Sequence, residues 1–193
     1  MTIFLILAPY GAFTLLMLVT SATVSLFAAA AICLAVIAFD MVRGRSVKIL
    51  GAGSVIVFVA VGGYLTLIDS SLSISGVKFA VDTGIFLVTL LSIAIRFPFT
   101  LQYAREVVDA ETAVLPGFIR ANYIITWAWT GSMLLMMIGN IALIYVPGLP
   151  LWSSLLIAFA ARNSAVYFTK WYPQYRRAKF GPPSASAGAL SGS

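Results

Sequence analysis

The chain has 193 residues, of which 61% are hydrophobic and only 9% are charged, and its mean hydropathy is +1.02. An ordinary soluble domain is about 45–50% apolar, so this composition indicates a multi-pass membrane protein. The net charge is +6, but the twelve basic residues stand in short clusters between apolar stretches, which favours membrane anchoring over nucleic-acid binding. With no histidine and one cysteine, His-based triads and the usual zinc, haem and iron–sulfur sites are excluded, and no cofactor is expected.

Five apolar stretches are long enough to cross a membrane, because a helical crossing needs about 20 mostly apolar residues. They cover residues 22–41, 50–68, 77–97, 121–146 and 149–168. A sixth stretch, residues 3–20, contains Pro9 and Gly11, so it either spans with a kink or lies as a re-entrant or interfacial piece. The sequence therefore predicts an all-α, polytopic transmembrane helical bundle of six spans, with five as the alternative, in one domain over residues 1–180.

The distribution of basic residues predicts the orientation of this bundle. With six spans, eleven of the twelve fall on one side, Arg162 among them near the inner end of the last span, and only Lys78 lies opposite. The positive-inside rule then places both termini in the cytoplasm. After the last span, the segment FTKWYPQYRRAKF is expected to anchor the chain at the interface, with binding of lipid or an acidic partner as the alternative. Residues 181–193 are rich in Gly, Pro, Ser and Ala, which predicts a disordered tail.

The stretch RFPFTLQYARE, residues 96–106, opens the longest connection between spans. After Pro98, apolar residues recur at helical spacing at Leu101, Ala104 and Val108. The other side is polar and consists of Gln102, Arg105, Glu106 and Asp109. This pattern predicts a short cytoplasmic amphipathic helix on the inner leaflet, with Arg105 and Asp109 paired four residues apart. Arg105, Glu106 and Asp109 are the candidate docking residues, and a plain solvated loop is the alternative. The carboxylates have no nucleophile or metal partner, so the chain is not expected to be an enzyme.

Polar residues inside the predicted spans are the second set of candidates, because ionisable groups in a membrane are costly. Lys78 and Asp82 stand four residues apart on one helical face and are expected to neutralise each other, with a proton or cation relay as the alternative. Asn122 and Asn140 lie in the fifth span, where hydrogen bonding between helices is the first interpretation and a polar lining is the second.

Several fragments, taken in order, resemble the intracellular septation protein A family. They are LAPYGAF, Lys48 opening a span, VGGYLTLI followed by Lys78, LLSIAIRFPF, and GNIALIY followed by Trp152. The resemblance covers about residues 1–155, and GGYLTL followed by Lys78 is its most specific part. It implies a small multi-pass protein of a bacterial inner membrane, linked to cell division and envelope integrity, and it supplies no catalytic residue. Here Asn122 precedes Trp127 and Trp129 at a longer spacing than the family pattern has.

Three classes of function remain open on this basis, of which a membrane enzyme that uses the cytoplasmic carboxylates is the last. The first is a non-catalytic membrane protein that acts through lipids, through membrane protein partners or as a homo-oligomer, in the cell envelope or division apparatus. The alternative is a small-molecule or ion transporter or channel subunit, for which Lys78, Asp82 and the polar fifth span are the evidence.

Overall fold

The computed structural model describes residues 2–146 and 148–180, and this part of the chain is all-helical, as predicted, without a strand. Six helices are long: α1 (Thr2–Val19), α2 (Ala22–Val42), α3 (Ile49–Leu67), α4 (Ile74–Ala94), α7 (Pro116–Tyr145) and α8 (Leu151–Phe180). Two are short: α5 (Phe99–Arg105) and α6 (Ala110–Val114). The predicted tail, residues 181–193, lies outside the described residues.

Four of the long helices, α2, α3, α4 and α7, are long and apolar enough to cross a membrane. In α1 the described apolar part is shorter, from Ala8 to Val19, although the helix itself continues through Pro9. The second half of α8 carries four basic residues, Lys170, Arg176, Arg177 and Lys179, and Arg162 lies in its first half. The chain is therefore a helical protein with four clear membrane-spanning candidates.

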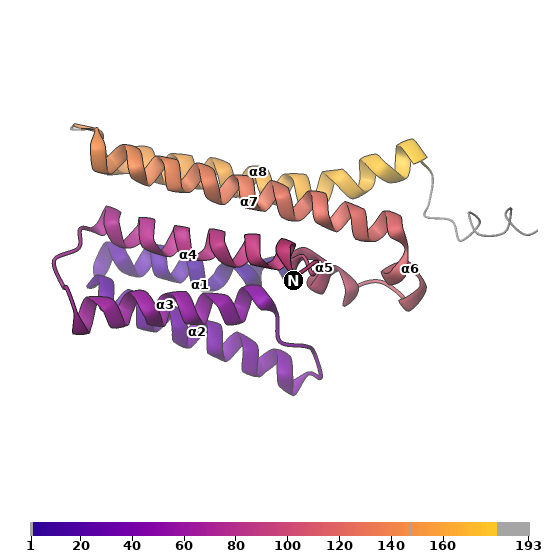
Figure 1. The fold of residues 1–193 in the computed structure, drawn as a ribbon, viewed down its shortest axis with the longest axis horizontal. Helices are drawn as coiled ribbons and strands as arrows, with labels where there is room; N and C mark the ends of the chain where they lie inside the picture. Colours follow the sequence, from indigo (N-terminus) through magenta and orange to yellow (C-terminus); the bar gives the residue numbers. More distant parts are fainter. Residues whose placement is uncertain (1, 147, 181–193) are drawn as a thin grey trace, which may run out of the picture.

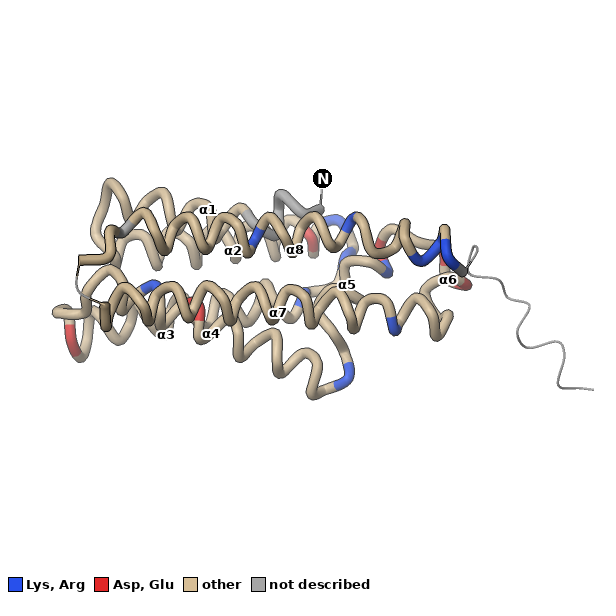
Figure 2. The backbone as a smooth tube through the Cα atoms, turned by 90° about the horizontal axis from the view of Figure 1, so that it is seen from above, with Lys and Arg blue, Asp and Glu red and all other residues tan. Residues whose placement is uncertain are grey.

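The long helices lie side by side in one bundle (Figure 1). Each of α1, α2, α3 and α4 packs on the next, and α4 then packs on α7, which packs on α8. The connections α1–α2, α3–α4 and α7–α8 lie together at one end of the bundle. The other end holds the α2–α3 connection, α5, α6 and the end of α8, and most of the basic residues gather there (Figure 2). We call the first of these the opposite end and the second the charged end.

The α3–α4 contact is close because glycine on each helix receives valine from the other. A Cβ atom added to Gly53 would lie 2.5 Å from Val88 Cγ1, and one added to Gly84 would lie 2.6 Å from Val57 Cγ1. Any larger residue at either glycine would push the two helices apart. This reciprocal contact fixes α3 beside α4.

The fourth helix ends earlier than residue 97, and its last turn redirects the chain into α5. Arg96 has φ of 57°, a left-handed conformation that is uncommon outside glycine, and the Phe97 amide donates to the Ser92 carbonyl at 3.0 Å. Pro98 then stands at the N-cap of α5. This turn directs the chain into α5, which packs on the bundle instead of continuing α4.

The last helix, α8, continues beyond the predicted span of residues 149–168 and ends at Phe180. Aromatic side chains one turn apart stack on its outer part: the Phe168 and Tyr172 rings are 5.2 Å apart, and the Trp171 and Tyr175 rings 5.1 Å apart. Such pairs at i and i+4 stabilise a helix. The predicted anchor segment after residue 168 is therefore a continuation of α8.

Candidate functional site

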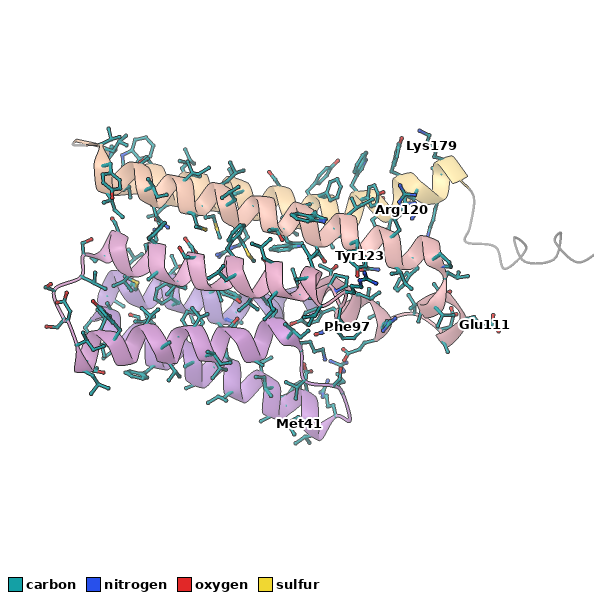
Figure 3. All side chains as sticks on the ribbon, viewed as in Figure 1. Met41, Phe97, Glu111, Arg120, Tyr123 and Lys179 are labelled. Carbon is teal, nitrogen blue, oxygen red and sulfur yellow. The ribbon has the colours of Figure 1, made fainter. Side chains whose placement is uncertain are left out.

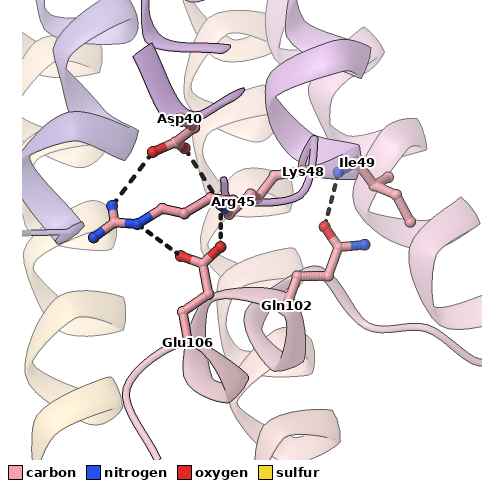
Figure 4. Close-up of polar contacts among 6 residues, drawn as sticks. All are labelled: Asp40, Arg45, Lys48, Ile49, Gln102 and Glu106. Atoms are coloured by element: carbon pink, nitrogen blue, oxygen red, sulfur yellow. Dashed lines mark hydrogen bonds and ion pairs between the residues drawn. The ribbon is translucent and has the colours of Figure 1, made fainter. Parts of the chain in front are cut away.

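A cluster of four charged side chains closes the charged end of the bundle (Figure 4). Lys48 is at its centre and is only 4% exposed. Its Nζ lies 2.5 Å from Glu106 Oε1 and 3.3 Å from Asp40 Oδ2. Arg45 completes the ring, with Nη1 3.3 Å from Asp40 Oδ1 and Nε 3.9 Å from Glu106 Oε2. Two cations and two anions therefore neutralise each other in this cluster.

Two consecutive helices and one distant helix position this charged cluster. Asp40 comes from the last turn of α2, Lys48 is the N-cap residue of α3, and Glu106 follows α5. Gln102 of α5 accepts a hydrogen bond from the Ile49 amide at 2.8 Å, which satisfies one of the free N–H groups at the start of α3. The α5 segment thus ties the end of α2 to the beginning of α3.

The charged cluster is sealed on its bundle side. The Lys48 ammonium lies 5.7 Å from the centre of the Tyr103 ring, and burial raises the pKa of the Tyr103 hydroxyl, which therefore stays neutral. Behind Tyr103 a pocket of about 30 Å³ lies against Tyr10, Cys33 and Ser54. That volume holds one or two water molecules and no organic ligand. The arrangement is suited to locking helices together.

The predicted surface helix is wrong in its placement, since α5 is built into the bundle. Phe99, Thr100, Leu101 and Gln102 are all buried. The Thr100 hydroxyl lies 2.7 Å from the Thr126 hydroxyl and donates to the Asn122 carbonyl at 2.8 Å. Leu101 points into protein where the sequence pattern suggested lipid. Helical periodicity identifies an apolar side but cannot say which medium covers it.

The three predicted docking residues lie apart and have different partners. The Arg105 guanidinium lies 5.5 Å from the centre of the Phe97 ring, and Glu106 belongs to the charged cluster. Asp109 caps α6 by accepting from the Thr112 amide at 2.7 Å, and this hydrogen bond lowers the pKa of its carboxyl group. The predicted Arg105–Asp109 pair is not formed, because α5 ends at Arg105. Glu111 on α6 points away from the bundle (Figure 3).

A second polar group lies inside the bundle, and we call it the interior polar cluster: Lys78, Asp82, Asn140 and Ser154. Asn140 Nδ2 donates to Asp82 Oδ2 at 2.6 Å, and Lys78 Nζ donates to Ser154 Oγ at 3.3 Å. Among the described residues, Lys78 and Asp82 form no ion pair within 4.0 Å, so the predicted neutralising pair is replaced by contacts with α7 and α8. Asn140 and Ser154 are buried.

Arg162 of α8 has a different neighbour. Its guanidinium lies 5.9 Å from the centre of the Tyr10 ring of α1. The remaining candidate, Asn122, donates to the Phe118 carbonyl of its own helix at 3.0 Å and lies apart from this cluster, near α5.

Sequence reasoning missed Asp40 and Arg45 as members of the charged cluster. The missing signal for the charged cluster was the pairing of Lys48 with an acidic residue 58 positions away. A usable indication existed, because Lys48, at the start of an apolar helix, and Glu106 were predicted on the same side of the membrane. Charges on one side, at helix ends that can pack together, are candidate partners.

The residues described in the structure hold no group of three His, Cys, Asp or Glu side chains that could bind a metal. No family model, curated protein or solved structure matches the chain. Membership of the septation protein A family stays a prediction, and the functional conclusions below depend on the geometry of the two clusters and on the distribution of charge.

Proposed function

We propose that the chain spans a bacterial inner membrane six times, with both termini in the cytoplasm, and acts without catalysis through lipids and membrane protein partners. The observation that carries this proposal is the gathering of charge at one end of the bundle. Ten of the twelve basic residues belong to that end; the exceptions are Lys78 and Arg162. Both α1 and α8 lie alongside the four clear membrane-spanning candidates, which supports six crossings (Figure 1). The resemblance to septation proteins supports a place in the envelope or division apparatus.

Reporter fusions test the topology directly. A reporter that is active only outside the cytoplasm should give no signal at either terminus and a signal in the α3–α4 connection near Asp69. A signal at the C-terminus would contradict the orientation. A signal at the N-terminus alone would mean that α1 does not cross.

The last third of α8 is the surface best suited to lipid. Trp171 and Tyr175 are 40% and 41% exposed and stacked, and Lys170 and Arg177 are exposed on the same segment. Aromatic rings at the membrane boundary with basic side chains beside them favour anionic phospholipid headgroups. Binding of this kind needs no reaction centre.

Lipid retention after purification tests this surface. The variant Lys170→Gln with Arg177→Gln should lose phosphatidylglycerol that co-purifies in mild detergent, measured by mass spectrometry of the intact complex. The matched control is Arg43→Gln with Arg120→Gln, which removes the same charge from the same end but from α7 and the end of α2. Equal lipid loss in both variants would refute a specific role for α8.

Transport is the second candidate function, and the interior polar cluster favours it. Asp82 and Lys78 lie within α4, one of the clear spanning candidates, and are hydrogen bonded to α7 and α8. Ionisable groups at that depth mark ion or substrate paths in many membrane proteins. Uptake of ions or small molecules into vesicles that contain the purified protein tests this candidate function.

A further inference from the structure

A polar side chain on α8 faces away from the rest of the bundle. The long helices pack in the order α1, α2, α3, α4, α7 and α8, so α8 is the last of the series (Figure 1). Asn163 is exposed, and so are Leu156, Ala160 and Tyr167, which recur with it at spacings of four, three and four residues. Residues at this spacing share one face of a helix. The exposed face of α8 therefore has an amide near its centre.

This amide lies near the middle of the proposed membrane crossing. Asn163 is eleven residues beyond Trp152 and seven before Lys170, both exposed, where an interfacial aromatic residue and a cytoplasmic cation are expected. At 1.5 Å per residue these separations are about 16 Å and about 11 Å along the helix axis, and their sum is close to a hydrocarbon core about 30 Å thick. At that depth water cannot hydrate an exposed amide.

Most of the hydrogen-bonding capacity of the Asn163 amide is unused within the chain. Its Nδ2 donates to the Phe159 carbonyl of the same helix at 2.8 Å. No other described residue bonds it, so one N–H donor and the Oδ1 acceptor remain. An unpaired amide in hydrocarbon is strongly unfavourable, and asparagine side chains inside membranes form hydrogen bonds between helices. The amide therefore favours another helix over lipid on this face of α8.

We propose that this face of α8 binds the same face of a second copy of the chain, with Asn163 at the centre of a two-fold contact. Copies of one chain insert in the same orientation, so identical residues lie at the same depth and meet across an axis normal to the membrane. An amide that keeps one donor and one acceptor can pair with its own copy through two hydrogen bonds. The small side chain of Ala160, about one turn away, permits the close approach that this pairing needs.

The charges on the same side of α8 determine how the two copies cross. Lys170 lies about two turns from Asn163 toward the charged end, and Arg177 lies about four turns from it. Like charges repel, so the two helices are closest near Ala160 and diverge toward the charged end. Membrane helices commonly cross at angles of about 20–40°, which allows this divergence. The inference rests on the proposed crossing by α8, and it names the partner and the surface that the proposed function leaves open.

Subunit counting by single-molecule photobleaching, with the full chain in liposomes, measures the contact. The fraction of wild-type dimers should rise with the ratio of protein to lipid. Asn163→Leu should need a density about threefold to thirtyfold higher for the same fraction, a range that corresponds to the strength of hydrogen bonds between membrane helices. Asn163→Gln keeps a donor and an acceptor, so it should dimerise more strongly than Asn163→Leu.

A bulky side chain on the same face tests the close approach. Ala160→Phe should lower the dimer fraction further, because its ring keeps the two helices apart. The matched control is Ala60→Phe, which adds the same ring to an exposed alanine near the middle of α3 and should dimerise as the wild type does. Both alanines are exposed in the single chain, so neither substitution disturbs its core.

Wild-type protein that remains monomeric at every density would overturn the proposal. Dimers that persist unchanged in both Asn163→Leu and Ala160→Phe would also overturn it, since the contact would then lie elsewhere. A different protein cross-linked to residue 160 in native membranes, with no cross-link between copies, would assign this face to another partner and reject the second copy.

Labelling of Ala160→Cys separates this inference from the proposed crossing. Cys33 is the single cysteine of the chain, so Cys33→Ala provides the background. A water-soluble maleimide should leave residue 160 unlabelled in liposomes, because it lies within the hydrocarbon. Labelling would show that α8 does not cross and would overturn both proposals, whereas monomeric protein with residue 160 unlabelled would overturn the dimer alone.

Discussion

Replacing Lys48 by methionine should destabilise the protein more than any other loss of one positive charge at the charged end. Methionine has a similar length and fits the buried position, but it leaves Asp40 and Glu106 facing each other with only Arg45 to compensate them. Removing one partner of a fully buried ion pair costs about 3–5 kcal/mol. Here the carboxylates are 14% and 19% exposed and Arg45 remains, so we expect about 2–3 kcal/mol.

A double-mutant cycle separates the ion pair from other effects of the substitution. Glu106→Gln combined with Lys48→Met removes one charge of each sign, so the double variant should lose less stability than the sum of the two single variants. The expected coupling is about 1–2 kcal/mol for groups in direct contact.

Denaturant unfolding in mild detergent, followed by tryptophan fluorescence, gives these free energies. Arg120→Met is the control, because Arg120 is exposed, and it should change the free energy of unfolding by no more than about 0.5 kcal/mol. A Lys48→Met protein within that margin of the wild type, or strictly additive single variants, would refute the view that the charged cluster stabilises this end.

Three further predictions concern helix packing and caps. Gly53→Ala should lower the free energy of unfolding by about 1–3 kcal/mol, because its Cβ would lie 2.5 Å from a valine of α4. The control Gly63→Ala, whose Cβ would have nothing within 4 Å, should leave the free energy of unfolding unchanged or raise it by up to about 1 kcal/mol in the same assay. Thr83→Val should raise the free energy of unfolding by about 1 kcal/mol, since the buried Thr83 hydroxyl has no hydrogen-bond partner among the described residues; a loss of stability would contradict this. Asp109→Ala should lower the protection of the α6 amides against hydrogen exchange, relative to the intrinsic exchange rate at the same pH. The wild type should lose the same protection as the pH falls through the lowered pKa of Asp109, because only the ionised carboxylate accepts both Thr112 hydrogen bonds. Unchanged exchange in the variant would show that the cap is dispensable.

The sequence was sufficient for the helices themselves, because length and apolar content define membrane-spanning candidates almost independently of tertiary contacts. The starts of α2 and α3 agree with the predicted spans within one residue. The end of α8 was missed, since a basic and aromatic segment resembles an interfacial anchor whether or not it continues a helix.

The partners of the polar residues could not be predicted, and the reason is distance along the chain. Asp82 was matched with Lys78 four residues away, but its hydrogen bond comes from Asn140, which is 58 positions away. Local spacing shows which side chains share a helix face, whereas the neighbouring helix decides which of them meet.

The long separation between Lys48 and Glu106 has a consequence for biogenesis. A ribosome adds about 5–20 residues per second, so the 58 residues that separate them take about 3–12 seconds to synthesise. During that interval α3 can enter the membrane while the Lys48 ammonium is still hydrated and has only Asp40 and Arg45 beside it. Arrival of α5 then buries the ammonium and holds α2 and α3 in place after insertion. Glu106 is thus the last of the four cluster charges to be made, and it completes a cluster whose other three members already lie at the ends of α2 and α3.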